Sequence, residues 1–359
     1  MSVIDEDELS VDEESQDDEA YVPYDITAYP SDLTLIGIHA MWHSGDLIVP
    51  EFQRNFVWTI QQSSLLIESF LMGLPVPQMF LYVDDENRSL VIDGLQRMMS
   101  IVYFFDGYFG DESIQGKKQV FRLLGLSERS PFHKKTFSEL TDSSQRKLKN
   151  SVLRAINIRQ MNPKGEKTSV YHIFERLNTG GTPLKPQEIR NCVFRGQIVD
   201  VLRKANQDKN WRKIIGKNTF DRHQKDVELV LRVFALATSF GSYEKPMKEF
   251  LNRAMQENQT GEGRKVSEFV VAFPEICELV VQKLPEKPFH LRGGRLNVSA
   301  LDSVIATLLM NRRRIPDDLG RRYGKLKGDE KFDAATFYGT SDVAVVKDRF
   351  EAAKRHLIG

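Results

Sequence analysis

Residues 78–105 read QMFLYVDDENRSLVIDGLQRMMSIVYFF, and this stretch decides the fold of the first part of the chain. Two apolar runs rich in β-forming residues are separated by the polar segment DDEN, which predicts a hairpin. Asp93 and Gly94 end the second run, and the apolar side chains that follow recur at helical spacing as far as Phe105. The Asp-Gly pair is therefore expected between a strand and a helix N-terminus, where backbone N–H groups and the helix dipole favour anions.

Further elements are predicted on both sides of this stretch. Upstream, Thr59 and Gln62 form a capping-box pattern before an amphipathic run that Gly73 ends, which predicts a helix. Downstream, the pattern predicts a strand at 152–158 and helices at 168–177 and 186–196.

From residue 197 onward the apolar spacing is almost entirely helical. Helices are predicted at 226–240, 246–255, 266–284 and 296–311. We therefore expect an α+β domain followed by an all-helical domain. The predicted divisions are an acidic, disordered tail at 1–30, the α+β domain at 31–196 and the helical domain at 197–359.

The composition excludes several classes of protein. The chain has 359 residues, of which 41% are apolar, so it can form more than one hydrophobic core. Its two cysteines, Cys192 and Cys277, are too few for a disulfide framework or a four-thiolate zinc site, which favours a reducing cytoplasm. The acidic start does not have the pattern of a signal peptide, and no apolar run is long enough to predict a membrane span.

The net charge of zero conceals a separation of charge along the chain. Residues 1–30 contain eleven Asp or Glu and no Lys or Arg, whereas residues 145–225 contain 19 Lys or Arg and six Asp or Glu. Residues 311–327 add seven basic side chains against two acidic ones. Such basic density suits a polyanion such as nucleic acid, although solvated helix faces explain it equally well at this point.

Three segments combine Arg or Asn with turn chemistry that apolar packing does not require. They are PEFQRNFVW at 50–58, VIDGLQRMMSI at 91–101 and FERLNTGGTPLKPQEIRN at 174–191. In the second, Arg97 and backbone N–H groups could bind phosphate while Asp93 orients a metal ion or water. Alternatively, Asp93 caps the helix and pairs with Arg97, and spacing alone leaves both interpretations open. In the third, paired glycines allow close approach of a ligand, and Arg190 is expected to face the same space.

Taken in this order, the three segments resemble the family that forms the N-terminal domain of GmrSD-type modification-dependent restriction endonucleases. That domain is similar to the ParB and sulfiredoxin-like fold. The resemblance extends over about residues 33–310. It implies a ParB-like, NTP-binding and NTP-hydrolysing domain at 31–196 that works in a restriction or anti-phage defence system and senses foreign or modified DNA.

The resemblance also implies particular site residues. Asp93 and Arg97 correspond to the catalytic Asp and Arg of the family motif, and Asp93 would also hold Mg²⁺. The nucleotide-binding positions that it implies, together with Arg190, are Gln53, Arg54, Gly94, Gln96, Asn178, Thr179, Gly180 and Gly181. Leu95 departs from the family, whose best known form has Gln at that position, so one polar contact of the motif is missing here.

A nuclease domain is not evident. Relatives that cut DNA carry a His-Asn-His domain, and the seven histidines here form no such pair, so a separate partner chain is expected to supply cleavage. His39 and His43 have i, i+4 spacing on a predicted helix, but no third metal ligand is evident nearby, and we interpret the pair as structural. A homo-oligomer is expected.

Two further hypotheses remain. In one, nucleotide only switches the conformation of a DNA-binding protein that does not hydrolyse it. In the other, the chain is a protein-interaction module without nucleotide, in which the Arg residues form internal ion pairs. The sequence does not identify the nucleotide or the DNA feature that is read.

Overall fold

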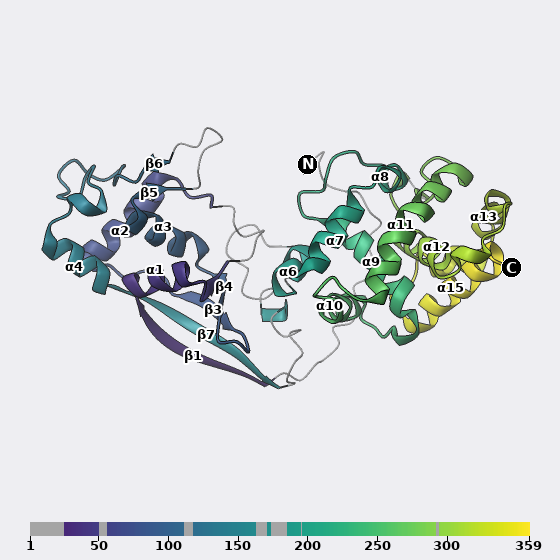
Figure 1. The fold of residues 1–359 in the computed structure, drawn as a ribbon, viewed down its shortest axis with the longest axis horizontal. Helices are drawn as coiled ribbons and strands as arrows, with labels where there is room; N and C mark the ends of the chain where they lie inside the picture. The colour runs from purple at the N-terminus through teal and green to yellow at the C-terminus, as the bar shows by residue number, and fades with distance from the viewer. Residues whose placement is uncertain are drawn as a thin grey trace. The chain divides into compact units, whose positions relative to one another are not determined.

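A computed structural model describes residues 25–49, 56–110, 118–162, 171–173, 185–194, 196–291 and 294–359. By their internal contacts these residues divide into two compact units (Figure 1). Of the described residues, those from 25 to 162 and residues 172–173 form the N-terminal unit, and residue 171 and those from 185 to 359 form the helical unit.

The N-terminal unit is built on a mixed five-stranded sheet with the strand order β1-β7-β3-β4-β2. The strands are β1 (Asp25–Thr34), β2 (Leu47–Ile48), β3 (Met79–Val83), β4 (Ser89–Asp93) and β7 (Val152–Asn162). The predicted hairpin is confirmed, because β3 and β4 pair antiparallel with Leu81 opposite Val91. Strand β7 then pairs parallel with β3 and antiparallel with β1, which completes the sheet. A second, two-stranded sheet joins β5 (Tyr108–Phe109) to β6 (Gln119–Val120).

The predicted boundary of the acidic tail is wrong at its C-terminal end. Residues 25–30, which we expected to be disordered, form the first part of β1 and pair along β7. These six residues are all exposed, so the segment lacks the buried apolar face that would reveal a strand in sequence. Backbone hydrogen bonds to β7 hold it at the edge of the sheet instead.

Helices cover one side of this sheet (Figure 1). They are α1 (Leu35–Ser44), α2 (Ile60–Met72), α3 (Leu95–Asp106) and α4 (Asp142–Asn150), with the short 3₁₀ helix η2 (Phe137–Glu139). The Thr59 capping box opens α2 and Gly73 ends it in the left-handed conformation, both as predicted. Helix α3 packs against α1 and α2, and buried side chains such as Phe104 and Ile67 make up the core between them. An α+β region is thus confirmed.

The helical unit is all-helical, as predicted. Its helices are α6 (Pro186–Val193), α7 (Gln197–Asn206), α8 (Lys209–Ile215), α9 (Lys225–Ser239), α10 (Met247–Glu257), α11 (Arg264–Lys283), α12 (Val298–Met310), α13 (Leu319–Lys327), α14 (Glu330–Ala335) and α15 (Val343–Leu357), with the 3₁₀ turns η3 (Phe240–Ser242) and η5 (Arg312–Arg314). Helix α6 ends three residues before Gly196, which instead precedes α7 as its N-cap. Among the described residues, no helix is both long and apolar enough to cross a membrane.

A buried charge cluster connects three helices of this unit. Asp302 on α12 accepts hydrogen bonds from Arg232 on α9 at 2.8 Å and from Arg349 on α15 at 3.4 Å. The side chains of Asp302 and Arg349 are fully buried, and that of Arg232 is 3% exposed. Because a buried carboxylate needs compensating charge, this cluster restricts how the three helices can pack.

Candidate functional site

The strand-to-helix corner at Gly94 is the first candidate site. Strand β4 ends at Asp93, and Gly94 then serves as the N-cap of α3 with a φ of 103°. An added Cβ at Gly94 would lie 2.6 Å from Cβ of Met79 on the neighbouring strand β3. Glycine is therefore required here for two reasons, the left-handed backbone and the close approach of β3.

Among the described residues, no side chain caps α3, so Asp93 does not act as the N-cap that one interpretation of the sequence proposed. The first amide N–H groups of a helix have no intrahelical acceptor, and together they form the positive end of the helix dipole. The corner therefore has the local features of an anion-binding helix N-terminus.

The other part of that interpretation is correct, because Arg97 pairs with Asp93. Arg97 Nη2 donates to Asp93 Oδ2 at 2.8 Å and to the carbonyl oxygen of Gln78 at 3.1 Å. The Asp93 side chain remains 47% exposed, whereas the Arg97 side chain is 17% exposed. Arg97 Nε is buried and has no acceptor among the described residues. The corner thus presents an accessible carboxylate next to a mostly buried guanidinium whose Nε has no acceptor among the described residues.

Gln96 connects the corner to the segment before α2. Its Oε1 accepts hydrogen bonds from the backbone N–H groups of Val57 at 3.0 Å and Trp58 at 3.1 Å. Gln96 therefore holds the chain that immediately follows Gln53 and Arg54 against the N-terminus of α3. This positioning role was not evident from the sequence, because the two segments are separated by the whole of α2 and the hairpin.

The remaining predicted residues fall into two groups. Gln53, Arg54 and the loop residues Asn178, Thr179, Gly180 and Gly181 lie outside the described residues.

Arg190 lies on α6 in the helical unit, where its side chain is 2% exposed. It donates to Glu228 at 2.8 Å and to Asn252 at 2.9 Å, and its guanidinium carbon lies 5.5 Å from the centre of the Tyr171 ring. These contacts give Arg190 a packing role within the helical unit, and its nucleotide-binding role stays a prediction.

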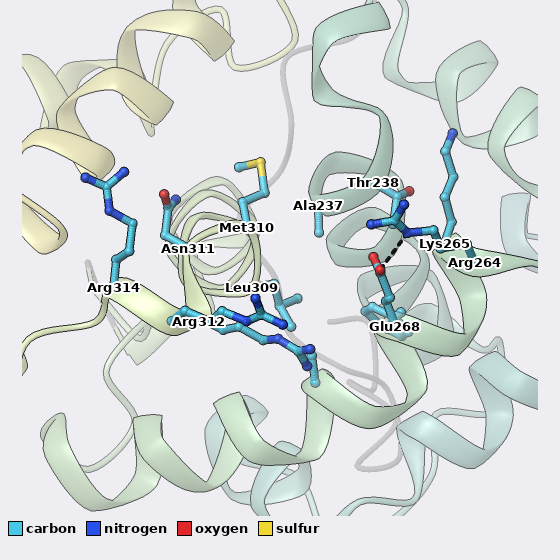
Figure 2. A pocket seen from close by; sticks show the side chains of 13 residues that line it. Ala237, Thr238, Arg264, Lys265, Glu268, Leu309, Met310, Asn311, Arg312 and Arg314 are labelled. Carbon is cyan, nitrogen blue, oxygen red and sulfur yellow. Dashed lines mark hydrogen bonds and ion pairs between the residues drawn. The ribbon is translucent and has the colours of Figure 1, made fainter.

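A second candidate site is a basic pocket of about 580 Å³ in the helical unit (Figure 2). Its basic side chains come from the start of α11 and from η5, which follows α12. They are Arg264, Lys265, Arg312, Arg313 and Arg314. One carboxylate, that of Glu268, also lines the pocket, so the pocket is strongly cationic.

The charges in this pocket are only partly neutralised. Arg264 Nε donates to Glu268 at 2.8 Å, and this hydrogen bond is the main cause of the lowered pKa of Glu268. Lys265 Nζ donates to the Ser239 hydroxyl at 2.9 Å, and Arg312 lies 4.0 Å from the nearest carboxylate oxygen of Glu275. Arg313 and Arg314 form no ion pair within the described part of the chain. The pocket can therefore contact an extended anion through several separate guanidinium groups.

The sequence indicated only some of the basic residues that line this pocket. The arginines of η5 belong to the basic cluster at 311–327, but Arg264 and Lys265 lie almost 50 residues earlier, outside both basic clusters. Packing of α11 against α12 brings the two groups together. The sequence contains no local signal for that proximity.

Comparisons with known proteins give one family match. Residues 38–195 match the family described as GmrSD restriction endonuclease, N-terminal domain. A search of curated proteins found no match. The matched range includes the β3–β4 hairpin, Gly94, the whole of α3 and the predicted Gly-Gly loop. The match therefore assigns residues 38–195, which are less than half of the chain, to a GmrSD restriction endonuclease N-terminal domain.

Proposed function

We propose that this chain is the nucleotide-responsive, DNA-contacting component of its restriction system. The corner at Asp93, Gly94 and Arg97 would bind the phosphates of an NTP, and the helical unit would contact the DNA backbone. The observation that carries the nucleotide assignment is the uncapped N-terminus of α3 beside Arg97, which retains an unpaired Nε donor among the described residues. A ParB-like mode of nucleotide binding belongs to the same proposal.

The groups in the corner fit an NTP with Mg²⁺. Backbone N–H groups at the start of α3 and the guanidinium of Arg97 are donors suited to phosphate oxygens. Asp93 is half exposed and can bind Mg²⁺ as a carboxylate ligand, and the ion would neutralise phosphate charge. Through its bonds to Val57 and Trp58, Gln96 would hold these two residues beside the start of α3.

Hydrolysis requires a group that orients or activates water, and Asp93 is the candidate for that role. Its Oδ2 already accepts a hydrogen bond from Arg97, so part of the acceptor capacity of the carboxylate is used before a water molecule binds. The same observation favours a second candidate function, in which the nucleotide switches the conformation of the protein without being hydrolysed. Phosphate release in the presence of Mg²⁺ distinguishes the two functions.

The test compares Arg97→Ala with Arg122→Ala in the full chain. Arg122 is a matched control because it too bonds one carboxylate, that of Glu139 at 2.8 Å, and one backbone carbonyl, that of Lys134 at 3.0 Å, within the same unit. Loss of charge-assisted hydrogen bonds from Arg97 to phosphate should cost about 1.5–3 kcal/mol, or roughly ten- to a hundredfold in nucleotide affinity. Arg122→Ala should leave the affinity unchanged.

The measurements are calorimetric titration of each variant with ATP, GTP, CTP and UTP in Mg²⁺, and phosphate release with plain and modified duplex DNA. Equal affinity in the parent and Arg97→Ala, both folded by circular dichroism, would remove the corner as the nucleotide site. Binding without phosphate release at any DNA concentration would establish the switch and exclude the hydrolase.

A further inference from the structure

Two histidines and an aspartate converge on one point of the N-terminal unit, away from the corner. His39 and His43 lie one turn apart on α1, and Asp106 is the last residue of α3. Asp106 Oδ1 lies 2.8 Å from His39 Nε2 and 3.0 Å from His43 Nε2. The ligand atoms of the three side chains all lie within 4.8 Å of one another. The structure thus supplies the third ligand that the sequence did not reveal.

The spacing suits a tetrahedral metal ion. Metal bonds of about 2.0–2.1 Å at tetrahedral angles separate two ligand atoms by about 3.3 Å. Each distance from an imidazole nitrogen to the carboxylate oxygen would therefore need to lengthen by only about half an ångström or less. Two imidazoles one helical turn apart, completed by a carboxylate from a separate element, form a common ligand set for Zn²⁺.

The surroundings of the three residues favour a cation. Asp106 lies at the C-terminal end of α3, where the negative end of the helix dipole disfavours an isolated carboxylate. In the described part of the chain, its only ion-pair partners are the two histidines. The side chains are 24%, 52% and 34% exposed for His39, His43 and Asp106, so an ion and a water molecule can reach them.

We propose that His39, His43 and Asp106 bind a divalent transition-metal ion of the Zn²⁺ type, with a fourth position for water. The ion links α1 to the C-terminal end of α3. This site is separate from the proposed Mg²⁺ position at Asp93, because the 12-residue helix α3 separates the two by about 18 Å. The metal site therefore does not depend on nucleotide binding.

The test uses the full chain without a histidine tag, stripped with EDTA and titrated with Zn²⁺ by calorimetry and with Co²⁺ by visible absorption. The parent should bind one ion in this site, and Co²⁺ should give the absorption bands of tetrahedral coordination. At 100 times the dissociation constant, Zn²⁺ should raise the melting temperature of the N-terminal unit by roughly 5–10 °C.

His43→Gln and Asp106→Asn should each weaken this binding at least about tenfold and abolish the Co²⁺ bands. His356→Gln is the control, since His356 also bonds an aspartate, Asp329, at 2.7 Å, but in the helical unit. It should bind Zn²⁺ as the parent does. The His43 side chain is half exposed, so we expect His43→Gln to fold. This variant therefore still tests the site if Asp106→Asn does not fold.

Two results would overturn the proposal. One is the absence of saturable Zn²⁺ or Co²⁺ binding in the parent. The other is equal affinity in the parent, His43→Gln and His356→Gln, which would show that any bound ion lies elsewhere.

Discussion

Replacing Gly94 with alanine should destabilise the N-terminal unit more than the same change at the opposite end of the same helix. Gly94 and Gly107 flank α3, and both have positive φ, 103° and 81° respectively. Their surroundings differ, since a Cβ at Gly94 would lie 2.6 Å from Met79 Cβ, whereas a Cβ at Gly107 would have no atom within 4 Å. The pair of variants therefore separates the effect of the close contact from the effect of the backbone conformation.

The expected magnitudes follow from these two terms. A left-handed backbone costs a non-glycine residue about 1–2 kcal/mol, and both variants incur this cost. Overpacking costs a further 1–3 kcal/mol or so, and only Gly94→Ala incurs it. Met79 is fully buried in β3, and the contact involves its Cβ, which every residue except glycine carries, so rotation of the side chain cannot relieve it. Gly94→Ala should therefore lower the free energy of unfolding by about 2–5 kcal/mol.

Hydrogen exchange of α3 peptides in increasing urea measures this effect in the full chain, because the peptides report on the N-terminal unit separately from the helical unit. The slowest-exchanging amides should lose about 1–3 kcal/mol more protection in Gly94→Ala than in Gly107→Ala. Equal losses in the two variants would refute the argument that the close approach of β3 requires glycine at the corner.

Two further predictions concern the helical unit. Arg313→Ala should weaken binding to duplex DNA and reduce the slope of log K against log salt concentration by about 1, as expected for one lost phosphate contact. Lys347→Ala, an exposed substitution on α15, is the control and should not alter the slope. An unchanged slope for Arg313→Ala would show that this arginine does not contact the DNA. Asp302→Asn should lower the urea stability of the helical unit by about 3–5 kcal/mol, because it leaves buried guanidinium groups uncompensated. Asp342→Asn, at the exposed ion pair with Lys245 in the same unit, should cost at most about 1 kcal/mol. Similar losses in both variants would contradict the buried role of Asp302.

Elements with a strong local pattern were predictable from sequence. The α2 capping box, the β3–β4 hairpin, the Asp-Gly corner and the long helices α9, α11 and α12 all occur where the apolar spacing and turn residues indicate. These signals are reliable because backbone dihedral angles and nearby hydrogen bonds determine them within a few residues. Exposed elements were harder to predict. Strand β1 has no alternating apolar face, and α13 buries only Leu319, Tyr323 and Leu326 among charged residues and glycines.

The candidate site also has features that the sequence predicts and features that the sequence leaves open. Asp93, Gly94 and Arg97 are close in sequence, and their arrangement as a strand end, a left-handed turn and a helix start was predictable. What the sequence left open was whether Arg97 binds phosphate while Asp93 orients a metal ion or water, or whether Asp93 caps the helix and pairs with Arg97. The structure shows the ion pair without the cap, because Gly94 itself occupies the N-cap position.

By itself, the sequence determined the two-part architecture, the family that residues 38–195 match and the strand-turn-helix geometry of the corner, because each depends on residues that are neighbours along the chain. Only the tertiary structure decided which distant side chains share a site. Asp106 meets His39 and His43 because α3 packs against α1, and Arg264 meets the arginines of η5 because α11 packs against α12. Such contacts result from the burial of apolar helix faces, and the polar residues on the same helices are brought together as a consequence.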